Sequence, residues 1–153
     1  MPVINLTDLR AGLGRDQRLL GLDPGSRVIG VALSDVLLTL ASPYGAIPRG
    51  KLAAVAAEIR KISRKEGVGG LVVGLPLGLD GSAGPAAQAA RDWTHALSAA
   101  TRLPAALWDE RLSSSAVNRF LIGEADISRK RRAEVVDKLA AAYILQAALD
   151  AGA

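Results

Sequence analysis

Acidic residues stand at the ends of two apolar segments that are predicted to be buried strands. Asp23 ends the run 18–23, and the pair Asp109 and Glu110 follows the run 104–108. In open sheets with crossover helices, groups at the carboxyl ends of strands line the binding crevice. The sequence therefore predicts that two strands, far apart along the chain, bring acids to the same edge of one sheet.

A third acid, Asp137, lies on the apolar face of the predicted last helix, which continues through Ala140, Ala141, Ile144 and Ala148. A carboxylate on such a face loses hydration unless a partner, a proton or a metal compensates for it. Taken alone, Asp137 is better explained by a salt bridge to Lys138 or Arg111, or by a position at the helix edge near solvent.

Taken together, the acids at these three positions favour a metal-binding cluster. Clustered carboxylates repel one another, and hard divalent cations such as Mg²⁺ or Mn²⁺, which prefer oxygen ligands, make the cluster tolerable. Two such ions can activate a water and stabilise the leaving oxygen in phosphodiester hydrolysis. Asp23 is expected to bridge them from the central strand, with Asp109, Glu110 and Asp137 completing the site. Which of the adjacent pair points inward stays open.

A run of basic residues opens the predicted last helix: Arg129, Lys130, Arg131 and Arg132. At a helix N-terminus each opposes the helix dipole, at a cost of up to about 1 kcal/mol. A solvated face is the usual explanation of such a run. Its place one or two turns before Asp137 instead favours contact with backbone phosphates beside the acids. Arg27 and Arg111, next to the other acids, are predicted to contact nucleic acid as well.

The composition is compatible with a polyanionic partner. The 153 residues carry a net charge of +4, and the aromatic content is 3%, so phosphate and shape recognition are favoured over base-specific contacts. The absence of cysteine fits a reducing cytosol and excludes thiolate metal sites. No apolar stretch approaches the roughly 18 residues that span a bilayer, and the first residues lack the features of a secretory signal. We therefore expect a cytoplasmic protein without a membrane partner.

The periodicity predicts a short N-terminal tail or cap over 1–17 and a single domain over 18–153. Strands are expected at 18–23, 28–34, 44–47, 70–74 and 104–108, and helices at 51–66, 84–100, 113–123 and 129–151. Helices between the later strands imply parallel crossovers, whereas the opening strands form an antiparallel meander. The predicted fold class is α/β, with a five-stranded mixed sheet flanked by helices.

Four segments, in this order, resemble the signature blocks of the YqgF family, also called RuvX: "GLDPGSRVIGVALSD", "VVGLPLGLDGSAGP", "WDERLSSSAV" and "DKLAAAYILQ". The resemblance covers about 19–149. It implies an RNase H-like fold and a nuclease related to Holliday-junction resolvases that processes the 5′ end of pre-16S rRNA. It also implies that Asp23, the Asp109–Glu110 pair and Asp137 form the acidic site. Gly78 and Ala83 depart from the family's usual Asn and acid, in a loop that concerns substrate contacts more than the metal site.

Two other classes of function stay open at this point. The first block also resembles the phosphate loop of actin-like ATPases and sugar kinases, but those proteins need a second domain and a second Gly-rich loop. A nucleic-acid-binding factor without catalysis, acting in transcription or ribosome assembly, is the other alternative. The sequence does not choose between pre-rRNA and branched DNA, nor between a monomer and a homodimer, although a resolvase acting on a two-fold junction would need a dimer.

Overall fold

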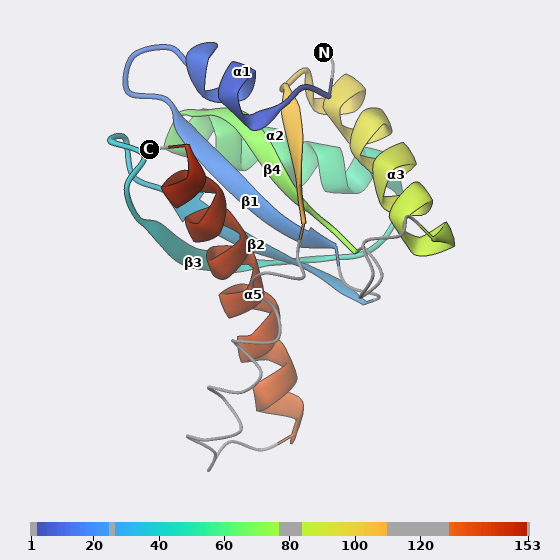
Figure 1. The fold of residues 1–153 in the computed structure, drawn as a ribbon. Helices are drawn as coiled ribbons and strands as arrows, with labels where there is room; N and C mark the ends of the chain where they lie inside the picture. Colours follow the sequence, from blue (N-terminus) through green and yellow to red (C-terminus); the bar gives the residue numbers. More distant parts are fainter. Residues whose placement is uncertain (1–2, 25–26, 77–83, 110–128, 153) are drawn as a thin grey trace.

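A mixed sheet forms the centre of the computed structural model, which describes residues 3–24, 27–76, 84–109 and 129–152, with side chains in the last range from residue 139 onward. Within this part of the chain the sheet has five strands, in the order β3-β2-β1-β4-β5 (Figure 1). The strands are β1 (Arg18–Pro24), β2 (Val28–Ser34), β3 (Ala41–Pro48), β4 (Val68–Leu75) and β5 (Ala105–Asp109).

The direction of each strand confirms the predicted combination of a meander with parallel strands. β1 pairs antiparallel with β2, and β2 pairs antiparallel with β3. β1 also pairs in parallel with β4, and β4 with β5. The third strand is longer than predicted because it pairs with β2 from Ala41 to Pro48, including residues with no clear apolar pattern. The central strand β1 is therefore held by hydrogen-bond ladders on both sides.

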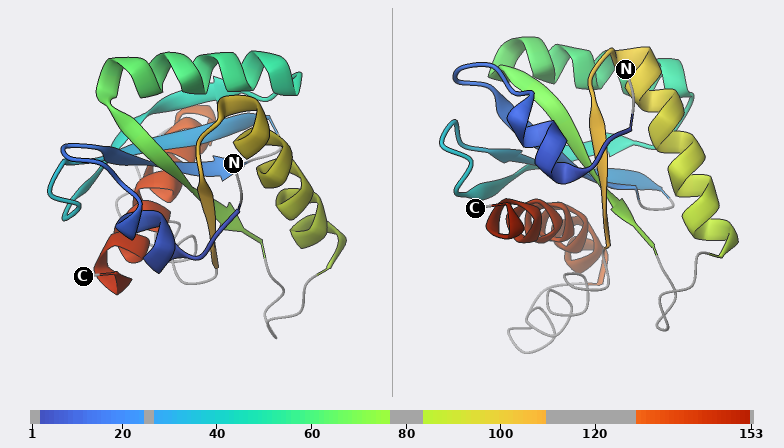
Figure 2. Two further views of the ribbon diagram at one scale, coloured as in Figure 1. Left: turned by 90° about the horizontal axis from the view of Figure 1, so that it is seen from above. Right: turned by 45° about the horizontal axis from the view of Figure 1, so that its top comes forward.

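Helices cover both faces of the sheet (Figure 2). α2 (Leu52–Glu66) and α3 (Pro85–Thr101) pack on one face, over Leu20, Leu22 and their neighbours. α5 (Arg129–Ala151) packs on the other face, over Leu19 and Val72. None of the helices among the described residues has the length and apolarity needed to cross a membrane. The helix predicted at 113–123 lies outside the described residues.

The 1–17 segment contains a short helix, α1 (Leu6–Ala11), where the sequence predicts only a loose tail or cap. Its N-cap is Asn5, whose side-chain oxygen accepts a hydrogen bond of 2.8 Å from the Asp8 N–H. Leu9 is buried in the core beneath α5, and the Arg10 guanidinium donates to the Leu149 carbonyl oxygen at 3.2 Å. The segment thus packs against the C-terminal end of α5.

Candidate metal centre

Asp23 stands near the carboxyl end of β1 and is half-buried. It lies opposite Gly30 in the antiparallel ladder with β2. Side chains along a strand alternate between the two faces of a sheet. Because Leu20 and Leu22 belong to the core beneath α2 and α3, whereas Leu19 belongs to the core beneath α5, the alternation places Asp23 on the α5 face.

Asp109 ends β5, and the backbone brings it to the same edge of the sheet as Asp23, since the two strands flank β4 in parallel. The faces differ, however. Ala106 and Trp108 belong to the core cluster beneath α5, while Leu107 packs against the clusters beneath α2 and α3. Strand alternation therefore places Asp109 on the face opposite to Asp23.

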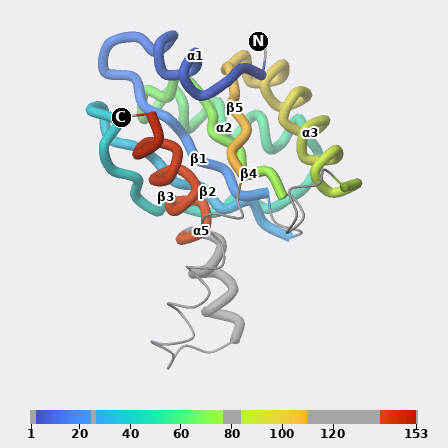
Figure 3. The backbone as a smooth tube through the Cα atoms, in the orientation of Figure 1, coloured from blue at the N-terminus to red at the C-terminus, as the bar shows by residue number. Residues whose placement is uncertain are grey.

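The third predicted ligand, Asp137, belongs to the N-terminal half of α5. Farther along this helix, Ala141 and Leu145 pack directly on Gly21 of β1. Position 137 precedes Ala141 by four residues, about one helical turn. Figure 1 shows that the N-terminal half of α5 extends beyond the edge of the sheet at which β1 ends, whereas its C-terminal half lies across the sheet (Figure 3).

The close contact between α5 and β1 depends on Gly21. A Cβ at this position would lie 2.8 Å from the Cβ of Leu145 and 3.1 Å from the Ala141 carbonyl oxygen. A second attachment comes from Gln146, whose side chain accepts from the Ala41 N–H at 2.9 Å and donates to the Thr39 carbonyl oxygen at 2.9 Å. Gly21 and Gln146 both lie in the sequence blocks quoted above, but their roles in positioning α5 were not predicted. The signals in the sequence are the small size of the glycine and the hydrogen-bonding side-chain amide of the glutamine.

Asp35, the last residue of the first block, has a structural role in the β2–β3 turn. Its carboxylate accepts hydrogen bonds from the Leu40 N–H at 3.0 Å, the Thr39 hydroxyl at 2.7 Å and the Thr39 N–H at 2.8 Å. These donors stabilise the charged form and lower the pKa of Asp35 to about 2. Asp35 lies at the opposite end of β2 from Gly30, the partner of Asp23, so it does not belong to the candidate site.

Several predicted site residues lie beyond what the structure describes. Glu110 and Arg111 fall outside the described residues, and the side chains of Asp137 and of the basic run 129–132 are not described. Arg27 is described, and it is exposed in the turn after β1. Among the described side chains, no three acidic, His or Cys groups gather as a metal site. Of the four predicted acids, Asp23 and Asp109 are the two whose side chains are described. The donor type at Asp23, a carboxylate on a rigid strand, fits Mg²⁺ or Mn²⁺.

The relationship to known proteins follows from the whole chain. A family model described as "RuvX: Holliday junction resolvase" matches residues 17–151. The chain belongs to the RuvX family. A protein of Gluconacetobacter diazotrophicus is 71% identical over all of this chain and 99% of its own length. One of Acidiphilium cryptum is 63% identical over 98% of this chain and 94% of its own length. Both RuvX relatives carry the name "Putative pre-16S rRNA nuclease".

A solved structure confirms the predicted RNase H-like fold of this RuvX chain. The RuvC protein of T. thermophilus, solved in complex with a Holliday junction substrate, superposes with a TM-score of 0.53 at 15% identity. The match covers 88% of this chain and 94% of RuvC. At this identity the likeness concerns the fold alone.

Proposed function

We propose that this protein is a divalent-metal-dependent nuclease that hydrolyses phosphodiester bonds at the 5′ end of pre-16S rRNA, a reaction of the cytoplasm. The observation that carries the proposal is the full-length identity of 71% to a relative named for this activity, combined with Asp23 at the carboxyl end of the central strand. In sheets of this type that edge is the expected position of a reactive site.

In this proposal Asp23, Glu110 and Asp137 hold Mg²⁺ or Mn²⁺, two ions in all. The bound ions would supply an activated water and neutralise the charge on the leaving oxygen. Asp23 contributes a fixed negative charge, because β1 is paired on both sides and cannot shift without breaking two ladders. Arg27, Arg111 and the residues of the 129–132 run would hold the phosphates on either side of the cleaved bond.

Strand alternation supports Glu110 over Asp109 as the metal ligand. Asp109 is placed on the α3 side of the sheet, away from Asp23 and α5. We therefore assign the metal to Glu110 and expect Asp109 to contribute to the site only indirectly.

The test is cleavage of a pre-16S 5′ leader fragment with Mn²⁺ by three isosteric variants. Asp23→Asn and Glu110→Gln should lose at least about 100-fold in rate, the loss typical of removing one group that stabilises a transition state electrostatically. Asp109→Asn, the matched control beside Glu110, should stay within about 10-fold of the unmodified protein, a smaller loss than that of a group in the site. Asp23→Asn should melt at the same or a higher temperature without metal, because it removes one member of a repelling acidic cluster.

A second substrate, branched DNA, is favoured by the description of the family as a Holliday junction resolvase. The same acids would serve both reactions, so the same variants are tested on a four-way DNA junction. Resolution of that junction would also require a dimer, which sedimentation would detect. Binding of nucleic acid without cleavage of either substrate would instead support a non-catalytic factor.

A further inference from the structure

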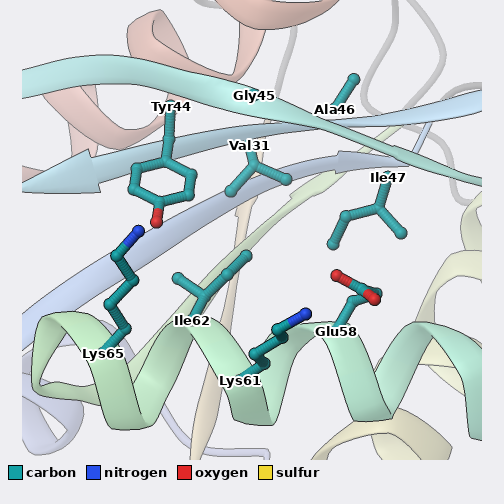
Figure 4. A pocket seen from close by; sticks show the side chains of 9 residues that line it. All are labelled: Val31, Tyr44, Gly45, Ala46, Ile47, Glu58, Lys61, Ile62 and Lys65. Carbon is teal, nitrogen blue, oxygen red and sulfur yellow. The ribbon is translucent and has the colours of Figure 1, made fainter.

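A groove runs between the edge strand β3 and helix α2, on the sheet face opposite to α5. It consists of two adjoining hollows of about 270 Å³ and 290 Å³, which share Ala46, Ile47 and Glu58. We call it the β3–α2 groove. Figure 4 shows one of the hollows: Tyr44 of β3 and Lys65 of α2 reach toward each other across it, beside Val31 and Ile62.

The second half of α2 is strongly basic, with four exposed side chains: Arg60, Lys61, Arg64 and Lys65. They form two pairs spaced four residues apart, an arrangement in which like charges destabilise a helix. The helix dipole favours cations only in the last turn, which holds Arg64 and Lys65. Helix stability alone therefore does not explain this spacing.

The lysines of the groove form no ion pair with another described residue. Lys61 and Lys65 both line the groove, whereas Arg60 and Arg64 do not. Within the described part of the chain, the ion pair found joins Arg18 to Glu66 at 3.6 Å, and neither lysine has a carboxylate within 4.0 Å. Two ammonium groups thus face a groove whose single acidic side chain, Glu58, lies where the two hollows meet.

The walls of the groove suit a base as well as a phosphate. Its floor is formed by Val31, Ile47 and Ile62, and the ring of Tyr44 is 38% exposed at its rim. Aromatic rings beside a basic track are the usual platform for single-stranded nucleic acids, because every base presents a flat face. Among the described strands β3 forms the edge of the sheet, so a single-stranded nucleic acid can approach the groove from that side.

The groove is also in register with the candidate metal centre. Ala46, which lines both hollows, lies opposite Gly30, and Gly30 lies opposite Asp23, so the middle of the groove is level with that acid. Directly after the end of β3 lies Arg49, whose backbone N–H donates to the Arg27 carbonyl oxygen at 2.9 Å. A polynucleotide leaving the metal centre past Arg27 would reach the groove by passing around the β3 edge.

We propose that the β3–α2 groove binds a single-stranded segment of the nucleic-acid substrate, outside the cleaved bond. Lys61 and Lys65 contact its phosphates, and Tyr44 stacks on a base. This inference rests on the proposed function, because it takes the substrate to be a nucleic acid. It adds a second binding surface, on the opposite face of the sheet from α5.

The experiment compares two double variants of the full chain that remove equal charge from the same helix at the same spacing. Lys61→Gln/Lys65→Gln alters the groove, and Arg60→Gln/Arg64→Gln is the control. Binding of a fluorescent pre-16S leader RNA is measured by anisotropy in EDTA over a range of salt concentrations. Because the lysine variant removes two cations that bind phosphates, its slope of log K against log salt should fall by about 1.4. The arginine variant should change much less.

Two single variants give independent readouts. Glu58→Gln should tighten binding, because it removes the one negative charge from the groove, and Tyr44→Ala should weaken it with no change in salt slope. A leader shortened to the nucleotides around its cleavage site should bind the lysine variant and the unmodified protein equally. An equal loss of RNA affinity in both double variants would overturn the proposal, because binding would then depend only on the total positive charge of the helix.

The outcomes separate this inference from the proposed function. Binding is measured without metal, so it does not depend on whether the protein cleaves. Unchanged RNA binding by Lys61→Gln/Lys65→Gln, with cleavage still abolished by Asp23→Asn, would overturn the groove and leave the nuclease in place. In that case an acidic protein segment would become the better candidate for the groove. Loss of binding by the lysine variant, with no cleavage by any form, would leave the groove and overturn the nuclease.

Discussion

Replacing Gly21 by alanine tests whether α5 is held at a fixed distance from β1. The new Cβ would lie 2.8 Å from the Cβ of Leu145, and ordinary contact begins at 3.4 Å, 0.6 Å farther. It would also lie 3.1 Å from the Ala141 carbonyl oxygen. Neither atom can rotate away, because both are fixed to the helix backbone. The helix and the strand must therefore separate.

Overpacking of this kind lowers the free energy of unfolding by about 1–3 kcal/mol. For a chain of this size, each kcal/mol lowers the melting temperature by about 2–4 °C. Gly50→Ala is the matched control, because a Cβ at Gly50 meets nothing within 4 Å. That change should instead stabilise the protein by about 0.4–1 kcal/mol through the unfolded state. Urea unfolding followed by the fluorescence of Trp93 and Trp108 measures both variants.

The same displacement should reach the proposed site, because α5 also carries position 137. A misplacement of about 1 Å at a reacting centre can lower the rate about 100-fold. We therefore expect Gly21→Ala, assayed while fully folded, to cleave at least about 10-fold more slowly than Gly50→Ala. Equal stability of the two variants would refute the described packing of α5. Lowered stability with unchanged cleavage would refute the role of α5 in the site.

Two further predictions concern charge. Asp35→Asn should lower the free energy of unfolding near neutral pH, and the difference from the unmodified protein should vanish near pH 2. Because the folded protein lowers the pKa of Asp35, the charged carboxylate stabilises the fold above the ordinary carboxyl pKa, and this stabilisation is lost as the pH falls toward about 2. Urea unfolding across this pH range measures the effect, and a constant difference would contradict it. Arg131→Ala/Arg132→Ala should flatten the salt dependence of RNA binding by about one unit for each phosphate that is no longer neutralised, and an unchanged slope would return the run 129–132 to a solvated helix face.

Much of the fold could be predicted because apolar runs and periodicity determine the elements. The runs that became β1 and β2 are buried on both faces of the sheet, and α2 shows its apolar face at steps of three and four. The start of β3 could not be found this way, since pairing with β2 rather than burial makes Ala41 and Ser42 part of a strand. α1 was missed because a polar, glycine-containing segment concealed the Asn5 cap and the buried Leu9.

The sequence predicts at which edge of the sheet the acids lie, but not on which face of the sheet each one lies. The position of an acid after an apolar run predicts the end of a strand, and Asp23 and Asp109 both lie at the predicted edge. The face of the sheet on which an acid lies cannot be predicted in this way, because it depends on which residues of the strand pack against which helix. For β5 that was decided by the packing of Trp108 beneath α5, which the sequence alone did not reveal.

The arrangement of Asp23 explains why an acid should end a buried strand. Leu22, immediately before it, is fully buried, and the strand is bonded to β2 on one side and β4 on the other. Gly21 then lets α5 pack closely on the strand, because a Cβ at this position would lie 2.8 Å from the Cβ of Leu145. The carboxylate is therefore positioned by two ladders and a helix contact rather than by a loop. For the metal site proposed above, this rigidity would be useful, because the repulsion between clustered carboxylates would otherwise push them apart before an ion arrives.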